Sequence, residues 1–140
     1  MNEIDDAWLQ EAMPFARLIG VRLVSAAPGE VRGRLDWTPE HCTTASVLHG
    51  GVLMAFADTM GGICAFLNVR PGDGTSTIES KTNFFRAVRS GAVEAVTRPL
   101  HVGRTTVVVQ TDLHDAESRR VAQVTQTQAV LKLRPSDLDP

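Results

Sequence analysis

Hydrophobic residues fill one long segment in the middle of the chain. From Val52 to Leu67 almost every residue is apolar, and Asp58 is the one carboxylate in the run. The segment is too long for a strand, and it is too short and too interrupted by Gly, Thr and Asp for a membrane span. Apolar residues occur on every side of its helical wheel, so the pattern predicts a buried helix wrapped on all sides beneath a curved sheet. Asp58 is therefore expected to be at least partly buried.

Six other segments, separated by turn residues such as Pro28-Gly29 and Ser90-Gly91, are predicted to be strands, and apolar and polar positions alternate most clearly from Glu30 to Trp37. The predicted strands cover residues 21–26, 30–37, 75–86, 92–100, 105–114 and 120–134. Pro99 predicts a bulge or an edge near the end of the fourth strand. An amphipathic pattern over residues 5–18 predicts a short helix, which Pro14 ends or kinks.

The order of these elements is short helix, two strands, long helix, four strands. This order indicates an α+β fold in which six antiparallel strands meander around one central helix. One helix covers only one face of such a sheet, so we expect oligomerisation to cover apolar surface elsewhere.

Composition and charge narrow the function classes. The 140 residues are expected to form one domain, residues 1–140, and a formal charge of −2 provides no general attraction to nucleic acid. The chain shows neither a signal-peptide pattern nor an apolar run long enough to span a membrane, so no membrane partner is expected. Cys42 and Cys64 are its only cysteines, and one lies inside the predicted helix, which favours a reducing cytoplasm over disulfide bonds.

The start of the predicted helix carries candidate chemistry. Gly50 and Gly51 leave backbone N–H groups open to a ligand at the positive end of the helix. Asp58 follows Gly50 by about two helical turns, and burying a lone carboxylate is costly unless it is paired or used. Oxyanion donors together with such a carboxylate indicate a hydrolytic site. The alternative is a structural carboxylate, with glycines that only permit close packing.

Five motifs along the chain belong together. They are Pro14-Phe15 with Leu18-Ile19-Gly20-Val21, Val47-Leu48-His49-Gly50-Gly51-Val52, Ala57-Asp58-Thr59, Asn83-Phe84-Phe85-Arg86 and Gly103-Arg104-Thr105. With them the chain resembles the hotdog-fold thioesterases, in the PaaI-like and 4-hydroxybenzoyl-CoA thioesterase family, over residues 14–134. The resemblance implies a hotdog fold, a six-stranded antiparallel sheet wrapped around one long central helix, here with a short N-terminal helix.

The resemblance implies roles for three residues. Gly50 matches the glycine whose backbone N–H polarises the thioester carbonyl, and Asp58 matches the acid that activates water or attacks the carbonyl directly. His49 matches the motif histidine that orients the loop, and we expect it to be a hydrogen-bond donor rather than a general base. In this family the glycine and the acid come from opposite subunits, so a homodimer that shares the active site is expected, paired further into a homotetramer.

Two positions depart from the family pattern. Thr43 stands where the family often has Asn or Gln, and Gly62 stands where many members have Ser or Thr. Ser76 or Thr77, on the strand after the helix, is expected to supply a hydroxyl instead. The full set of expected substrate-binding residues is Gly51, Thr43, Gly62, Ser76, Thr77, Asn83, Phe84, Arg86 and Arg104.

Arginines at strand ends and turns provide charge for the phosphates of coenzyme A. They are Arg86, Arg89, Arg104, Arg119 and Arg120, and the first candidates are Arg86 and Arg104. Bulky apolar residues are expected to fill the core, and some of them to line an acyl tunnel. These residues are Trp8, Met54, Phe56, Met60 and Phe66.

The expected activity is hydrolysis of an acyl- or aryl-CoA thioester to the free acid and coenzyme A, without a metal or another cofactor. The alternatives are a non-catalytic acyl-CoA binding module and a hotdog hydratase or dehydratase, which starts its helix with a different turn. His41, Cys42 and His49 have a spacing that fits no zinc pattern, and Cys64 is expected to be a small core residue. The acyl group, and the choice between coenzyme A and an acyl carrier protein, stay open at this point.

Overall fold

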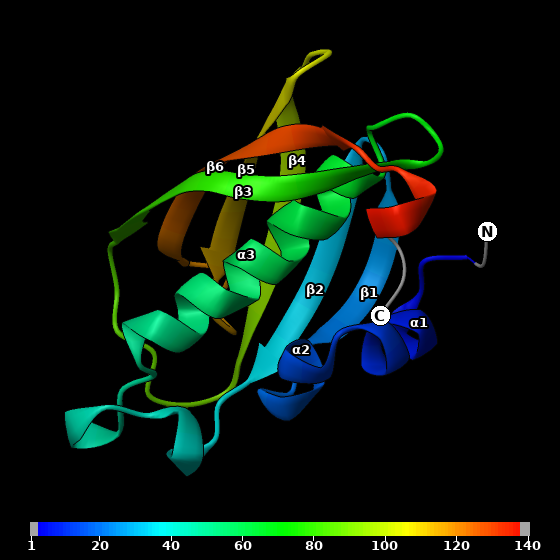
Figure 1. Ribbon diagram of the computed structural model, residues 1–140. Coiled ribbons are helices and arrows are strands. Elements are labelled where there is room, and N and C mark those ends of the chain that lie inside the picture. Colours follow the sequence, from blue (N-terminus) through cyan, green and yellow to red (C-terminus); the bar gives the residue numbers. More distant parts are fainter. Residues whose placement is uncertain (1–2, 138–140) are drawn as a thin grey trace.

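A long helix lies across the concave face of one antiparallel sheet (Figure 1). The structure is a computed structural model that describes residues 3–137; residues 1–2 and 138–140, the two ends of the predicted domain, lie outside it. The central helix α3 spans Gly50–Phe66, and the six strands follow the order β1-β2-β4-β5-β6-β3. This arrangement confirms the predicted α+β fold.

All six predicted strands form, and their ends differ from the predicted ends by no more than two residues. The strands are β1 (Arg22–Ala27), β2 (Glu30–Asp36), β3 (Asp73–Phe84), β4 (Ala92–Val102), β5 (Thr106–His114) and β6 (Arg120–Lys132). The register of β4 against β5 shifts between Pro99 and His101, which confirms the predicted bulge. β3 pairs only with β6 and forms one edge of the sheet.

The N-terminal segment forms two short helices rather than one. α1 (Asp6–Ala12) ends at Met13, and α2 (Pro14–Leu18) begins with proline at its first position, as the predicted break requires. Asp6 fastens this segment to the sheet, because its Oδ1 accepts a hydrogen bond from the Leu23 N–H of β1 at 2.8 Å. Three 3₁₀ turns complete the structure, at Pro39–His41, Thr44–Ser46 and Pro135–Asp137.

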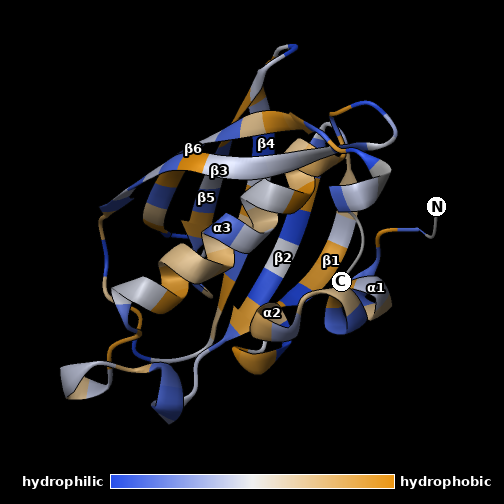
Figure 2. Ribbon diagram, viewed as in Figure 1, coloured by the Kyte–Doolittle hydropathy of each residue, from blue (hydrophilic) through white to orange (hydrophobic). Residues whose placement is uncertain are grey.

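The core lies between α3 and the concave face of the sheet. Phe56 and Met60 are fully buried on the inner face of the helix, against residues such as Val31 and Leu35 of β2. Figure 2 shows the result as apolar colour along most of α3 and in alternation along strands such as β2. None of the helices in residues 3–137 combines the length and hydrophobicity that a membrane span requires.

The prediction that α3 is wrapped on all sides is wrong for the single chain. Gly51, Met54 and Asp58 are exposed on the face that turns away from the sheet, and Gly62 is half-buried there. A helix that packs on one sheet buries only the face that touches it, so apolar side chains on the other face remain available for another surface. The expectations that Asp58 is partly buried and that Met54 belongs to the core are corrected for the same reason.

Candidate active site

A side-chain cap builds the start of α3. His49 precedes the helix in an extended conformation, and its Nδ1 accepts a hydrogen bond from the Gly51 N–H at 2.7 Å. The Val52 and Leu53 N–H groups both bond to the His49 carbonyl oxygen. Within residues 3–137, Gly50 is therefore the one residue of this first turn whose N–H has no acceptor. A single free donor thus stands at the positive end of the helix.

His49 acts in this cap as a hydrogen-bond acceptor through Nδ1, so only Nε2 is left for the donor role that was predicted for it. Because Nδ1 accepts, the neutral imidazole carries its proton on Nε2. The two glycines make the arrangement possible. A Cβ on Gly51 would lie 2.9 Å from Nδ1 of His49, and one on Gly50 would lie 3.1 Å from Cζ of Phe84. Glycine at both positions lets the histidine cap the helix and lets the Phe84 ring pack on its first turn.

Asp58 projects from the open face of α3 and is held by one of its two carboxylate oxygens. Oδ1 accepts hydrogen bonds from the Thr77 hydroxyl at 3.2 Å and from Nε2 of Gln126. Gln128 donates to the Thr77 oxygen at 2.7 Å, which leaves the hydroxyl hydrogen of Thr77 for Asp58. Thr77, and not Ser76, supplies the hydroxyl. Oδ2 of Asp58 has no protein donor in the described part of the chain.

A pocket of about 510 Å³ adjoins Asp58. The open face of α3 forms its floor, and residues of α1, α2 and the start of β3 form its walls. Trp8, Phe15 and Phe66 contribute aromatic surface, and Ser76 also lines the pocket. A concave, largely apolar pocket with a few polar groups on one side is typical of small-molecule sites.

Gly62 lies in the same pocket, one turn after Asp58. No atom lies within 4 Å of a Cβ built on Gly62. The space that the family pattern fills with Ser or Thr is thus open here, and the hydroxyl that reaches Asp58 comes from Thr77 on β3 instead.

Gly50 faces a different pocket, of about 340 Å³, at the other end of β3. Thr43, Phe84 and Arg86 line this pocket together with Gly50. With a rise of about 1.5 Å per residue, Gly50 and Asp58 stand about 12 Å apart along the helix axis. The free N–H and the carboxylate therefore cannot meet at one carbonyl group within a single chain.

The predicted arginines do not converge within the chain. Arg86 lies beside Gly50, whereas Arg104, in the turn between β4 and β5, lines a pocket with Asn68 and Lys132 near the C-terminal end of α3. Neither has an acidic partner among residues 3–137. The other three are bound to protein acceptors: Arg89 to the Ala45 carbonyl oxygen, Arg119 to Asp115 and Glu117, and Arg120 to Asp112. Of the expected substrate residues, Asn83 is exposed on β3 and makes no side-chain hydrogen bond in the described structure.

The cysteines are not arranged for nucleophilic or metal chemistry. Burial raises the pKa of the Cys64 thiol to about 11, so the thiolate is scarce at neutral pH. Cys42 is half-buried and donates to the Thr38 carbonyl oxygen at 3.3 Å. The described residues hold no group of three or more His, Cys, Asp or Glu side chains placed to bind a metal ion.

Sequence reasoning missed Gln126 and Gln128, although a signal was present. Both have the same parity along β6 as Ala122 and Val124, which face the core, so the alternating pattern places two amides beneath the helix. A buried amide needs a hydrogen-bond partner. The carboxylate of Asp58, in the one helix above the sheet, was the available acceptor.

Similarity to known proteins agrees with this architecture. The sequence profile of the Thioesterase superfamily matches residues 45–122, which include the start of α3, Asp58 and strands β3 to β5. The provisionally named esterase Rv1847 of Mycobacterium tuberculosis is 31% identical over 119 residues, which cover 82% of this chain and 84% of that protein. The proofreading thioesterase EntH of Cronobacter sakazakii is 33% identical over 85 residues, 61% of this chain and 62% of EntH.

Solved structures extend the likeness to almost the whole chain. Thioesterase HI1161 of Haemophilus influenzae superposes with a TM-score of 0.88 at 23% identity and covers 96% of both chains, which shows the shared fold. A mutant of thioesterase PA1618 of Pseudomonas aeruginosa has the same TM-score of 0.88 at 25% identity, over 94% of this chain and 97% of its own. The chain belongs to the thioesterase superfamily and is a thioester hydrolase of the hotdog fold.

Proposed function

We propose that the chain is an acyl-CoA thioesterase whose active site forms between two copies of the chain. The observation that carries this proposal is the placement of the free Gly50 N–H and the Asp58 carboxylate on one helix, too far apart to act together. Met54 stands midway between them and is 41% exposed. A two-fold axis at Met54 brings Gly50 of each copy beside Asp58 of the partner subunit, and an isologous contact of this kind builds two identical sites.

In the proposed reaction the Gly50 N–H of one subunit and the Asp58 carboxylate of its partner act on the same carbonyl group. The thioester carbonyl oxygen accepts a hydrogen bond from the Gly50 N–H, which stabilises the negative charge that develops on that oxygen. Oδ2 of Asp58 takes a proton from water while the water oxygen bonds to the carbonyl carbon. The C–S bond then breaks, and the proton passes to the sulfur of coenzyme A. Attack by Oδ2 itself, through a mixed anhydride that water cleaves, uses the same atoms.

The surroundings of the two halves suggest where the substrate lies. The apolar pocket beside Asp58 is suited to the acyl or aryl group. The guanidinium of Arg86, which lies beside Gly50 and has no acidic partner among the described residues, is suited to a phosphate of coenzyme A. Arg104 is proposed as a second phosphate contact, contributed from the far end of a neighbouring subunit. The reaction needs no metal or cofactor, because the N–H and the carboxylate supply the oxyanion donor and the base. Two dimers are proposed to pair into a tetramer.

Two substitutions test the carboxylate and the oxyanion donor separately. Asp58→Asn keeps the shape and removes the base or nucleophile, so kcat over a panel of acyl-CoAs should fall by about 10²–10⁴-fold. Gly50→Pro removes the oxyanion donor, and kcat should fall by about 10²–10³-fold. Proline suits the first helical position, and His49, with φ −63° and ψ 134°, already has the backbone favoured before proline.

Controls separate chemistry from folding. Gly50→Ala crowds Phe84 but keeps the N–H, so it should lose less activity than Gly50→Pro. Melting temperatures should stay near that of the wild type, because Asp58 is exposed in the single chain. Turnover of Asp58→Asn within a few-fold of wild type would show that the carboxylate is structural. Wild-type protein that binds acyl-CoA without cleaving any member of the panel would indicate a binding module.

A further inference from the structure

Two buried glutamines of β6 lie behind Asp58. Gln126 and Gln128 are each 1% exposed, although amide side chains are costly to remove from water. Gln126 donates directly to Oδ1 of Asp58, and Gln128 reaches the same oxygen through the Thr77 hydroxyl. Two buried amides thus hold the same oxygen of Asp58, Gln126 directly and Gln128 through Thr77.

The amide of Gln126 is held in a single orientation. Its Oε1 is buried and has no hydrogen-bond partner within residues 3–137. Turning the amide over would place Oε1 against the carboxylate of Asp58, and two acceptors would then face each other. Nε2 of Gln126 must therefore face Asp58 to donate its hydrogen bond. As a consequence, Oε1 has no hydrogen-bond partner within the described residues.

Gly61 makes the space in which this amide lies. A Cβ on Gly61 would overlap Oε1 of Gln126 and lie 2.8 Å from its Cδ. Gly61 and Asp58 are three residues apart on α3 and so lie on neighbouring turns of one face. Any side chain at position 61 would push the amide away from the carboxylate.

We propose that Gln126, in the space left by Gly61, and Gln128, acting through Thr77, are positioning residues for Asp58. They tie Oδ1 and so keep Oδ2 directed at the substrate. Without them the carboxylate rotates among several orientations, and the reactive one is populated for less of the time. This inference rests on the proposed function, in which Asp58 is the catalytic carboxylate.

Gln126→Met tests the proposal, because methionine fills a similar volume without a donor. We expect kcat to fall by about 10- to 100-fold, with KM and the affinity for a non-hydrolysable acyl-CoA analogue unchanged within a few-fold. The matched control is Gln123→Met. Gln123 also donates to a carboxylate, that of Asp112 at 2.9 Å, but on the other face of β6, and its loss should leave kcat unchanged.

Double variants distinguish a positioning role of Gln126 from a general effect on core packing. Gly61→Ala should lower kcat in the wild type, because it displaces the amide, but it should cause no further loss of kcat in Gln126→Met. In the Asp58→Asn background, Gln126→Met should cause no further loss of kcat, since the carboxylate that Gln126 positions is gone.

The outcomes distinguish the two proposals. An inactive Asp58→Asn together with full kcat in Gln126→Met would overturn the positioning role alone. An active Asp58→Asn would overturn the proposed function itself. Equal losses in Gln126→Met and Gln123→Met would assign the effect to the stability of β6 and also overturn the positioning role.

Discussion

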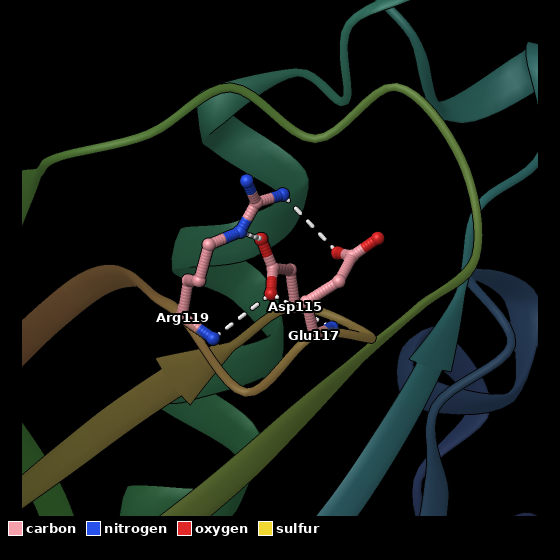
Figure 3. A network of polar contacts seen from close by, with 3 residues as sticks. All are labelled: Asp115, Glu117 and Arg119. Atoms are coloured by element: carbon pink, nitrogen blue, oxygen red, sulfur yellow. Dashed lines mark hydrogen bonds and ion pairs between the residues drawn. The ribbon is translucent and has the colours of Figure 1, made fainter.

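Asp115 holds the turn between β5 and β6 together (Figure 3). Its carboxylate accepts hydrogen bonds from the Glu117 N–H at 3.0 Å, the Arg119 N–H at 2.9 Å and the Arg119 side chain at 2.8 Å. Burial by itself would raise the pKa of the Asp115 carboxyl. The hydrogen bonds outweigh burial, however, and hold this pKa below its ordinary value. The ionised form is therefore favoured in the folded protein.

This pKa shift makes stability depend on pH in a defined direction. Because the folded-state pKa lies below the unfolded value of about 3.9, Asp115 stabilises the fold above that pH and loses its contribution as the pH falls through the folded value. Asp115→Asn should lower the melting temperature at pH 7. The difference from wild type should narrow below about pH 4.

Thermal melts of both proteins between acidic and neutral pH check this expectation. Asp36→Asn is the control, because the Asp36 side chain is 68% exposed and its ion pair with Arg34 should contribute little. A difference for Asp115→Asn that stayed constant down to the acid limit of folding would assign its role to hydrogen bonding that does not depend on charge.

At the level of the elements, alternation predicted β2 because its residues are buried and exposed in turn along the strand. β3 was predicted from the turns that bound it, since nearly all of its residues are exposed or half-buried. The kink at Pro14 followed from the missing N–H of proline. The open face of α3 was missed because apolar residues look the same whether they pack on the chain's own sheet or are left for another surface. Gln126 and Gln128 were missed because glutamine is ordinarily a solvent-facing residue, and only a buried partner such as Asp58 makes its burial favourable.

The two adjacent glycines of α3 give a prediction at this scale. A Cβ on Gly62 meets nothing within 4 Å, whereas one on Gly61 meets Gln126 and lies 3.2 Å from Cγ2 of Val109. Gly62→Ala should raise the free energy of unfolding by about 0.5–1 kcal/mol, because alanine favours the helix. Gly61→Ala should lower it by about 1–3 kcal/mol, because the extra methyl group overpacks the interface.

Urea unfolding of both variants measures these free energies. The pair is matched in helix position and in the atoms added, so an opposite sign of the two effects isolates the contacts of Gly61 with Gln126 of β6 and Val109 of β5. Effects of the same sign would contradict the close fit at Gly61.

For the molecule as a whole, the resemblance implied that Gly50 and Asp58 act from opposite subunits, and in the structure the two residues stand too far apart on α3 to act together within one chain. Their separation follows from helix geometry and was already visible in the spacing. The different pockets that they face follow from the packing of α1, α2 and β3 around α3, which no local pattern encodes.

The proposed dimer predicts a contact at Met54. If the two-fold axis passes there, Met54→Cys places two thiols within reach of a short bis-maleimide, and the product should run as a covalent dimer in a denaturing gel. Wild-type protein is the control, because Cys64 is buried and Cys42 is only half-exposed. A monomer that stays uncrosslinked, and that sediments as an active monomer, would contradict the shared site.

The distance between Gly50 and Asp58 on α3 has a genetic consequence. A chain with Gly50→Pro and a chain with Asp58→Asn are each defective in a different half of every site. In a mixed dimer one site contains both substitutions, and the other site contains the wild-type Gly50 and the wild-type Asp58. Two alleles that fail alone should therefore complement each other, and random mixing of equal amounts should restore about a quarter of the wild-type sites, as two-fold symmetry requires.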